Sequence, residues 1–418
     1  MKLLARTIIV LIAALGVSMP CFAQNNGNAG QGIKKIGNKF KNAATETFND
    51  AVSAVKGEGQ KGSSATVSVL YYVNSTLGSN RNDGTSQNSP FKNIQKAVET
   101  APEGSEILVA EGNYFGTLNS GNIIIDKGLT IKGGYSADFT ERNILKYRTT
   151  VCPTTSSDST QTGNGTMQIK ARKQGSKVVV DGLFFDRAGS ELETSEIFLD
   201  NAFCDIEIRN CAFVNAPFYA IKGSMSGSAV ITNNVFASVS AAAVEISGSN
   251  LVKNAEVKFS YNTVMFVHPG PSDRSDLACC YRFMNSVNSY LDHNVFGCAA
   301  ITALDRIKTD IVKERESQKV TTSEHNVFFA NAQADITLPG GSSPLKIRVA
   351  DFDDVEQLAK VEGNKASLDP SIFGGRLNED YFKGFQTSPA IKTQYSLDDA
   401  LDLFGAMDGY GAQSAKNK

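Results

Sequence analysis

The feature that most constrains the fold is an internal repeat in the second half of the chain. Six segments align on a final apolar residue: VVVDGLFF, IEIRNCAF, AVITNNVF, VKFSYNTV, SYLDHNVF and TTSEHNVF. Their last residues are Phe185, Phe213, Phe236, Val264, Phe296 and Phe328, spaced 28, 23, 28, 32 and 32 residues apart. Repeats of about 20 to 45 residues are typical of solenoids, in which each unit stacks on the next.

The same alignment predicts two further columns of stacked side chains. Asparagine stands two positions before the last residue in four consecutive repeats, at Asn234, Asn262, Asn294 and Asn326. Stacked asparagines hydrogen-bond from one repeat to the next, and asparagine tolerates the left-handed backbone of a tight corner. Five positions before the last residue lie Val180, Ile208, Ile231, Phe259 and Leu291, which are expected to fill the interior. Ser323 interrupts this apolar column.

The segment YYVNSTLGSNRNDGTSQNSPFKNIQKAVETAPEGSEILVAEGNYFG, residues 71–116, resembles the N-terminal module of the pectate-lyase-like superfamily, in particular its secreted bacterial members. LTIKGGYSADFTERN, residues 129–143, is similar to the family's next rung. The resemblance implies an all-β fold, a right-handed parallel β-helix over residues 67–412 with an N-terminal capping helix and a short tail at 413–418. In that helix, Ser89 is expected to be the N-cap and Pro90 the first helical residue.

The N-terminus predicts export. Residues 1–23 have the basic, apolar and cleavage regions of a secretory signal peptide, so the protein is expected to be secreted, periplasmic or at the cell surface. Residues 24–66 are expected to be flexible around an amphipathic helix at 33–56, which would pack on its own protein or adhere to a surface. No other apolar run approaches the roughly 20 residues of a bilayer span, so no transmembrane segment is expected.

Charge and cysteine content narrow the partners and the chemistry. With 41 basic and 43 acidic residues, the net charge of −2 gives no electrostatic reason to expect a nucleic acid partner. Six cysteines follow the signal peptide, which in an exported chain permits disulfide bonds, and a bond from Cys204 to Cys211 is one prediction.

A candidate site is expected on the sheet formed by the strands EIFLD, YAIKG, VEISG and YRFMN. Side chains alternate along a strand. Alternation is expected to turn inward Ile197, Leu199, Tyr219, Ile221, Val244, Ile246, Tyr281 and Phe283. It is expected to turn outward Glu196, Asp200, Lys222, Glu245 and Arg282. On neighbouring strands these outward side chains would form a strip of mixed charge. Such a strip is either a ligand site or a solvated row of compensating charges.

The loop at residues 268–280 is expected to flank this strip and to bring His268, Asp273, Arg274 and Asp276 to it. Glu196, His268, Asp273 and Arg274 would then bind substrate. In a lyase acting on an acidic sugar, Asp200 and Glu245 would hold Ca²⁺, and Lys222 or Arg282 would remove the proton.

A second cluster pairs Asp292 with His293 and, one repeat later, Glu324 with His325. Imidazoles beside carboxylates suit a transition metal. The alternative is that histidine replaces asparagine as a hydrogen-bonding corner residue.

Three functions from different classes remain open. The first is binding of a polysaccharide or cell-surface glycan without hydrolysis, the second is a Ca²⁺-dependent polysaccharide lyase, and the third is a structural or adhesive solenoid. Polygalacturonase-type hydrolysis is disfavoured, because the chain lacks the Gly-His-Gly motif and the grouped aspartates of that type, although Arg306-Ile307-Lys308 matches a short substrate-binding motif. Beyond Ca²⁺ in the lyase, no cofactor is expected.

Overall fold

A computed structural model describes residues 69–115, 123–152, 165–188, 194–248, 255–284, 287–306, 321–340, 342–356 and 358–414. All of them belong to one compact unit, Thr66–Lys418. The expected signal peptide, the helix at 33–56 and the end of the C-terminal tail lie outside the described residues. Among the helices in these ranges, none is long and apolar enough to cross a bilayer.

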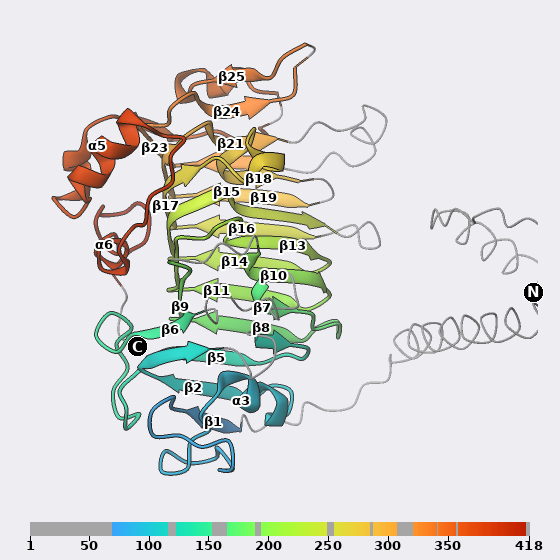
Figure 1. Cartoon of the computed structure of the whole chain (residues 1–418). Helices are drawn as coiled ribbons and strands as arrows, with labels where there is room; N and C mark the ends of the chain where they lie inside the picture. Colours follow the sequence, from blue (N-terminus) through green and yellow to red (C-terminus); the bar gives the residue numbers. More distant parts are fainter. Residues whose placement is uncertain are drawn as a thin grey trace, which may run out of the picture. The chain divides into compact units, whose positions relative to one another are not determined.

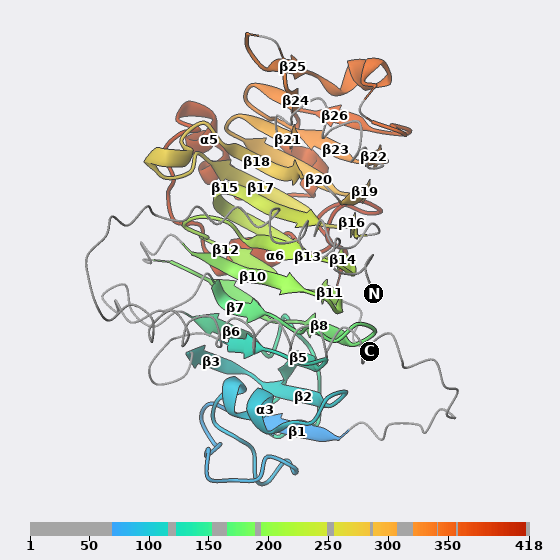
Figure 2. The same cartoon turned by 90° about the vertical axis from the view of Figure 1, so that its right-hand side faces the viewer.

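The described chain is a parallel β-helix whose strands stack as successive rungs from β1 to β24 (Figures 1 and 2). Each rung contributes strands to three sheets, called A, B and C here. Sheet A comprises β1 (Leu70–Val73), β2 (Glu106–Ala110), β5 (Thr130–Tyr135), β8 (Lys177–Asp181), β11 (Asp205–Arg209), β14 (Ser228–Thr232), β16 (Glu256–Ser260), β19 (Asn288–Asp292) and β22 (Thr321–Glu324).

Sheets B and C are joined because β15 (Val235–Gly248) passes through both. Sheet B also contains β3 (Gly112–Phe115), β6 (Thr149–Cys152), β9 (Phe184–Asp186), β12 (Ala212–Val214), β17 (Thr263–His268), β20 (Val295–Ala299), β23 (Val327–Phe329) and β26 (Lys365–Ser367). Sheet C also contains β4 (Ile123–Ile125), β7 (Gly165–Ile169), β10 (Ser195–Ala202), β13 (Ile221–Met225), β18 (Ala278–Phe283), β21 (Thr302–Arg306), β24 (Ala334–Leu338) and the antiparallel β25 (Leu345–Ile347).

The repeat predicted from the sequence is confirmed residue by residue. The six aligned final residues are direct neighbours in sheet B, from Phe185 beside Phe213 to Phe296 beside Phe328. The apolar column from Val180 to Leu291 is likewise in register in sheet A, and it continues to the buried Ser323. Phe185, Phe213 and Phe236 stack with ring centroids 5.1 and 4.7 Å apart, so the interior is a column of packed rings.

The asparagine ladder is confirmed as a structural device, and it is one residue longer than predicted. Each Nδ2 group donates to the Oδ1 atom of the next asparagine, at 2.9 Å from Asn234 to Asn262 and at 3.2 Å from Asn262 to Asn294. The ladder ends on Asn364, which lies outside the aligned repeats. Because Asn234, Asn262, Asn294 and Asn326 are fully buried, these bonds satisfy polar groups that water cannot reach.

The N-terminal helix is shorter than expected. Helix α3 spans Ile94–Thr100 and buries Ile94, Ala97 and Val98 against the interior column. Its N-cap is Asn93, without a side-chain capping bond, so the prediction that Ser89 caps the helix is wrong. Phe91 instead pairs with Val73 in an isolated β-bridge, so it lies before the helix rather than in its first turn.

The C-terminal segment, defined as residues 370–413, packs on the outside of sheet B (Figure 1). It contains the 3₁₀ helix η3 (Pro370–Phe373) and helices α5 (Glu379–Thr387) and α6 (Leu397–Asp402). Two further 3₁₀ helices, η1 (Ser272–Arg274) and η2 (Val349–Asp354), lie in loops before it. The segment inserts Phe382, Phe385, Tyr395 and Leu401 against the outward side chains of sheet B. This face of the coil is therefore covered by the protein itself.

The six described cysteines are all free thiols. The predicted disulfide between Cys204 and Cys211 is therefore not formed. The Cys211 thiol is buried and lies 3.1 Å from the Arg209 carbonyl oxygen, where it packs as a small apolar side chain.

Candidate functional site

The outer face of sheet C carries a row of charged side chains in direct register. Lys222 is paired with Glu245, Glu245 with Arg282, and Arg282 with Asp305. We call these four residues the charged strip. The predicted continuity of the sheet and the adjacency of Lys222, Glu245 and Arg282 on its outer face are confirmed.

Arg282 binds the carboxylates on both sides of it. Its Nη1 lies 2.9 Å from Oε2 of Glu245 and its Nε lies 2.8 Å from Oδ2 of Asp305. Burial opposes the charge of Arg282, but the hydrogen bond to Glu245 and the charge of Asp305 raise its pKa above the ordinary value. The guanidinium thus stays protonated, as a fixed donor with ordered partners.

Lys222 has a different environment, beside two aromatic rings. Its Nζ atom lies 4.0 Å from the ring centroid of Tyr219, 5.1 Å from that of Phe218 and 3.7 Å from Oε1 of Glu245. Burial lowers the pKa of Lys222, and the charge of Glu245 opposes that shift. Phe198, half-buried, is paired with Lys222 on the preceding strand, so aromatic side chains flank the lysine.

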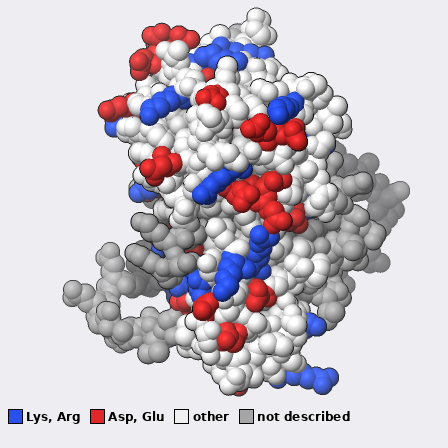
Figure 3. All heavy atoms as spheres, turned by 90° about the vertical axis from the view of Figure 1, so that its left-hand side faces the viewer, with Lys and Arg blue, Asp and Glu red and all other residues white. Residues whose placement is uncertain are grey.

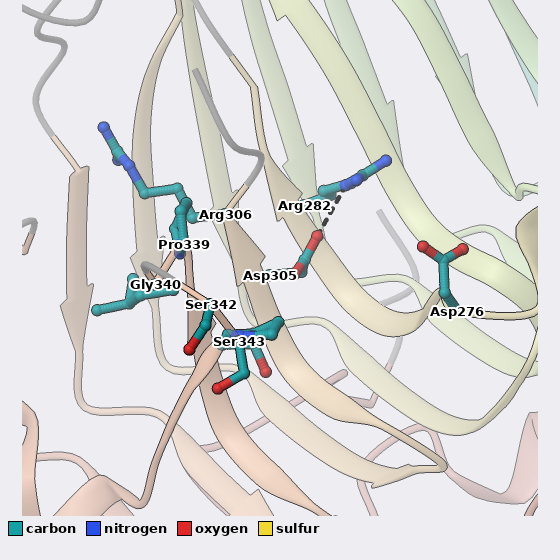
Figure 4. Close-up of a pocket in the computed structure, with 11 residues that line it drawn as sticks. Asp276, Arg282, Asp305, Arg306, Pro339, Gly340, Ser342 and Ser343 are labelled. Atoms are coloured by element: carbon teal, nitrogen blue, oxygen red, sulfur yellow. Dashed lines mark hydrogen bonds and ion pairs between the residues drawn. The ribbon is translucent and has the colours of Figure 1, made fainter. Parts of the chain in front are cut away.

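The strip leads into a cavity of about 300 Å³ at the end of the coil (Figure 4). Arg282 and Asp305 form one wall, Asp276 lies to one side of them in the flanking loop, and Arg306 follows Asp305 on the same strand. The opposite wall is the β24–β25 hairpin, with residues 337–340 and 342–344. The cavity thus brings together two arginines, two aspartates and two serines, Ser342 and Ser343.

The family comparison agrees with this fold. A family model described as "Protein of unknown function (DUF1565)" matches residues 76–348, about two thirds of the chain. The chain belongs to the DUF1565 family. The matched region contains the charged strip and every residue that lines the cavity. Among curated proteins, none matches the chain.

The loop at 268–280 flanks the strip in this DUF1565 protein, as expected. Asp273, Arg274 and Asp276 are exposed, and the charge of Arg274 contributes to the lowered pKa of Lys222. Tyr219 does not point inward, contrary to the prediction. It packs outside the main interior with Leu277 and Cys279, because the loop covers it.

Two residues expected at the strip are covered by the C-terminal segment. Glu196 is fully buried, next to Arg187 and Lys392, and burial raises its pKa while Arg187 opposes the shift. His268 is 1% exposed, and its Nδ1 atom lies 3.0 Å from the Pro389 carbonyl oxygen. The prediction that they reach a ligand at the strip is wrong, because a segment more than 100 residues away in the sequence packs over both.

Asp200 lies on the outer face but away from Glu245. It is two strands and two residues removed, which corresponds to about 12 Å from strand spacings of ~4.8 Å and rises of ~3.3 Å. Its Oδ2 atom accepts a hydrogen bond of 2.9 Å from Gln168. Since both oxygens of Glu245 already face Lys222 and Arg282, the structure does not bring these two carboxylates together for Ca²⁺.

Sequence reasoning missed Asp305, the hairpin wall and the aromatic flank. Asp305 precedes Arg306, the first residue of a short motif that lies outside the four strands predicted for the site. The register of β21 against β18 was the available signal, because Asp305 follows Arg282 in the outward column. The hairpin carried no such signal, since β25 is antiparallel and departs from the repeat.

On the side of the coil that bears α5 and α6, basic and acidic side chains are interspersed rather than separated by sign (Figure 3). The described residues on that face therefore form no extended surface of one charge.

Proposed function

We propose that this protein binds a polysaccharide along the outer face of sheet C, with one end of the glycan in the cavity beside Arg282. The observation that carries the proposal is the charged strip, which is in register with Phe198 on the preceding strand of sheet C and leads into the cavity beside Arg282 and Asp305. Five strands at ~4.8 Å spacing give a length of about 19 Å, which suits a polymer better than a single sugar.

The side chains on this face suit a sugar chemically. Aromatic rings such as Phe198 and Phe218 offer flat apolar surfaces to a sugar ring. Arginine and carboxylate groups such as Arg306 and Asp276 offer donors and acceptors for hydroxyl groups. Positive and negative groups alternate, so hydroxyl-rich chains are favoured over strongly anionic ones.

Because a signal peptide is expected at residues 1–23, we propose that this binding takes place outside the cytoplasm. We propose that the chain is related to the pectate-lyase-like superfamily, whose members include pectate and alginate lyases, polygalacturonases and surface proteins with no known catalysis. Fold alone does not establish either activity.

A lyase is the second candidate, because Lys222 packs against the rings of Tyr219 and Phe218, and this burial lowers its pKa. A lysine of lowered pKa is a suitable general base. The remaining geometry supports a lyase less well, because Arg282 is held protonated between two carboxylates and Asp200 is remote from Glu245.

The test is affinity electrophoresis of the full chain in gels containing neutral or acidic polysaccharides. We expect retardation by at least one polymer, and roughly tenfold weaker binding in Arg306→Ala and Lys222→Ala, the effect of about 1.4 kcal/mol. Lys258→Ala on sheet A is the matched control, since Lys258 is exposed on another face and should leave binding unchanged.

Absorbance of unsaturated products, recorded with the same polymers and Ca²⁺, separates the two candidates. An absorbance rise that Lys222→Ala abolishes would favour the lyase. No retardation with any polymer, or equal weakening by Lys258→Ala, would overturn the binding proposal.

A further inference from the structure

The second cluster noted in the sequence lies away from the charged strip, at the corner between sheets A and B. His293 and His325 directly follow β19 and β22 and adopt positive φ angles of 54° and 50°. Earlier rungs place Asn210, Asn233 and Tyr261 at the same corner, with φ of 53°, 58° and 53°. The corner interpretation of the two histidines is thus confirmed for their backbone.

The corner does not account for what the two side chains do. Both imidazoles turn their Nδ1 atoms to one carboxylate oxygen, Oδ1 of Asp292, at 2.8 Å from His293 and 3.3 Å from His325. Each of the three residues offers a ligand atom within 4.8 Å of the others. Glu324, expected to join them, instead pairs with Lys360.

The rings are held in place by their neighbours. The rings of His293 and His325 stack with centroids 4.9 Å apart, close to the spacing between adjacent rungs. Tyr261 stacks on the other face of His293 at 5.0 Å, and the Tyr410 ring lies 5.8 Å away. The Gly411 amide donates to the His293 carbonyl oxygen at 2.8 Å, which ties the C-terminal segment to this corner. Ligands fixed in this way bind without a large ordering cost.

We propose that Asp292, His293 and His325 bind one divalent transition metal ion of the zinc class. In a tetrahedral site with bonds of about 2.05 Å, ligand atoms lie roughly 3.3 Å apart. The distance from Nδ1 of His325 to Oδ1 of Asp292 is 3.3 Å, and the distance from Nδ1 of His293 to the same oxygen is 2.8 Å, so small side-chain movements would open the site for an ion. Two imidazoles and one carboxylate favour Zn²⁺, Co²⁺, Ni²⁺ or Cu²⁺ over Ca²⁺, which prefers oxygen ligands.

Such an ion would join two successive rungs, and solvent would complete its coordination, because the three side chains are 29–42% exposed. The proposal is independent of polysaccharide binding, since its residues lie at the corner between sheets A and B, whereas the charged strip lies on sheet C.

The test is equilibrium dialysis of the full chain, purified without a histidine tag and stripped with chelator, against Zn²⁺. We expect one ion per chain. His293→Asn and His325→Asn are suitable variants, because asparagine occupies the same corner in earlier rungs and should preserve the backbone. Each should weaken binding at least tenfold, and the double variant should abolish it. Asp292→Asn tests the carboxylate, and Asp126→Asn, at an exposed aspartate after β4, is the control.

Two results would overturn the proposal. One is the absence of saturable Zn²⁺ binding up to about 1 mM. The other is undiminished binding in the double variant. A Co²⁺ absorption spectrum of tetrahedral type in the unmodified chain, absent from Asp292→Asn, would support the ligand set even if the double variant failed to fold.

Discussion

Arg282 is predicted to be the main electrostatic support of sheet C, and its replacement by methionine tests this. Methionine keeps an unbranched apolar stem but removes the guanidinium, so Glu245 and Asp305 lose their shared cation. The two hydrogen bonds measure 2.9 and 2.8 Å, and the three side chains are only 10–21% exposed. Charge-assisted bonds contribute about 1.5–3 kcal/mol each, and partial exposure favours the lower end. Arg282→Met should therefore lower the free energy of unfolding by about 3 kcal/mol.

The assay is urea denaturation of the full chain at pH 7, followed by circular dichroism. Arg274→Met is the matched control, because Arg274 is exposed in the flanking loop, and it should change stability by less than about 0.5 kcal/mol. Neutralising Glu245 and Asp305 in the Arg282→Met background should restore part of the loss. Equal effects of Arg282→Met and Arg274→Met would refute the reasoning.

Two further predictions concern buried polar groups. Asn262→Ala removes four hydrogen bonds of 2.9–3.2 Å and should lower the free energy of unfolding, measured by urea denaturation, by about 4 kcal/mol. Asn113→Ala, at an exposed asparagine, should change it little. Equal losses in the two variants would contradict a stabilising role of the ladder. Burial lowers the pKa of His268 to about 4. As the pH falls, this imidazole is therefore protonated in the unfolded chain at a higher pH than in the folded protein. The free energy of unfolding should decrease by about 3 kcal/mol from pH 6.5 to 4, and His268→Gln should remove that decrease. If His268→Gln lost as much stability over this pH range as the unmodified chain, His268 would not be the cause.

The coil was predictable because a parallel stack repeats its environment from rung to rung. Phe213 and Phe236 occupy equivalent positions on adjacent rungs and have equivalent neighbours, so the sequence repeats where the contacts repeat. The order of Lys222, Glu245 and Arg282 followed from the same alignment. Local pattern was sufficient wherever a residue contacts the rung above or below it.

The errors came from parts that leave this pattern. Glu196 and His268 alternate as expected, but the C-terminal segment covers them, and its docking depends on contacts such as Asn215 with Tyr395, 180 residues apart. The periodicity of the repeats does not predict contacts between residues so far apart in the sequence. The cavity likewise depends on an antiparallel hairpin that breaks the repeat.

The most direct test of the binding face is hydroxyl-radical labelling of the full chain with and without a retarding polysaccharide, read by mass spectrometry. Phe198 and Phe218 are half-buried beside the strip, whereas Phe115 is 53% exposed at the other end of the coil. Binding along sheet C predicts that the polymer protects Phe198 and Phe218 and leaves Phe115 unchanged. Protection of Phe115 with unchanged labelling of Phe198 and Phe218 would contradict the account.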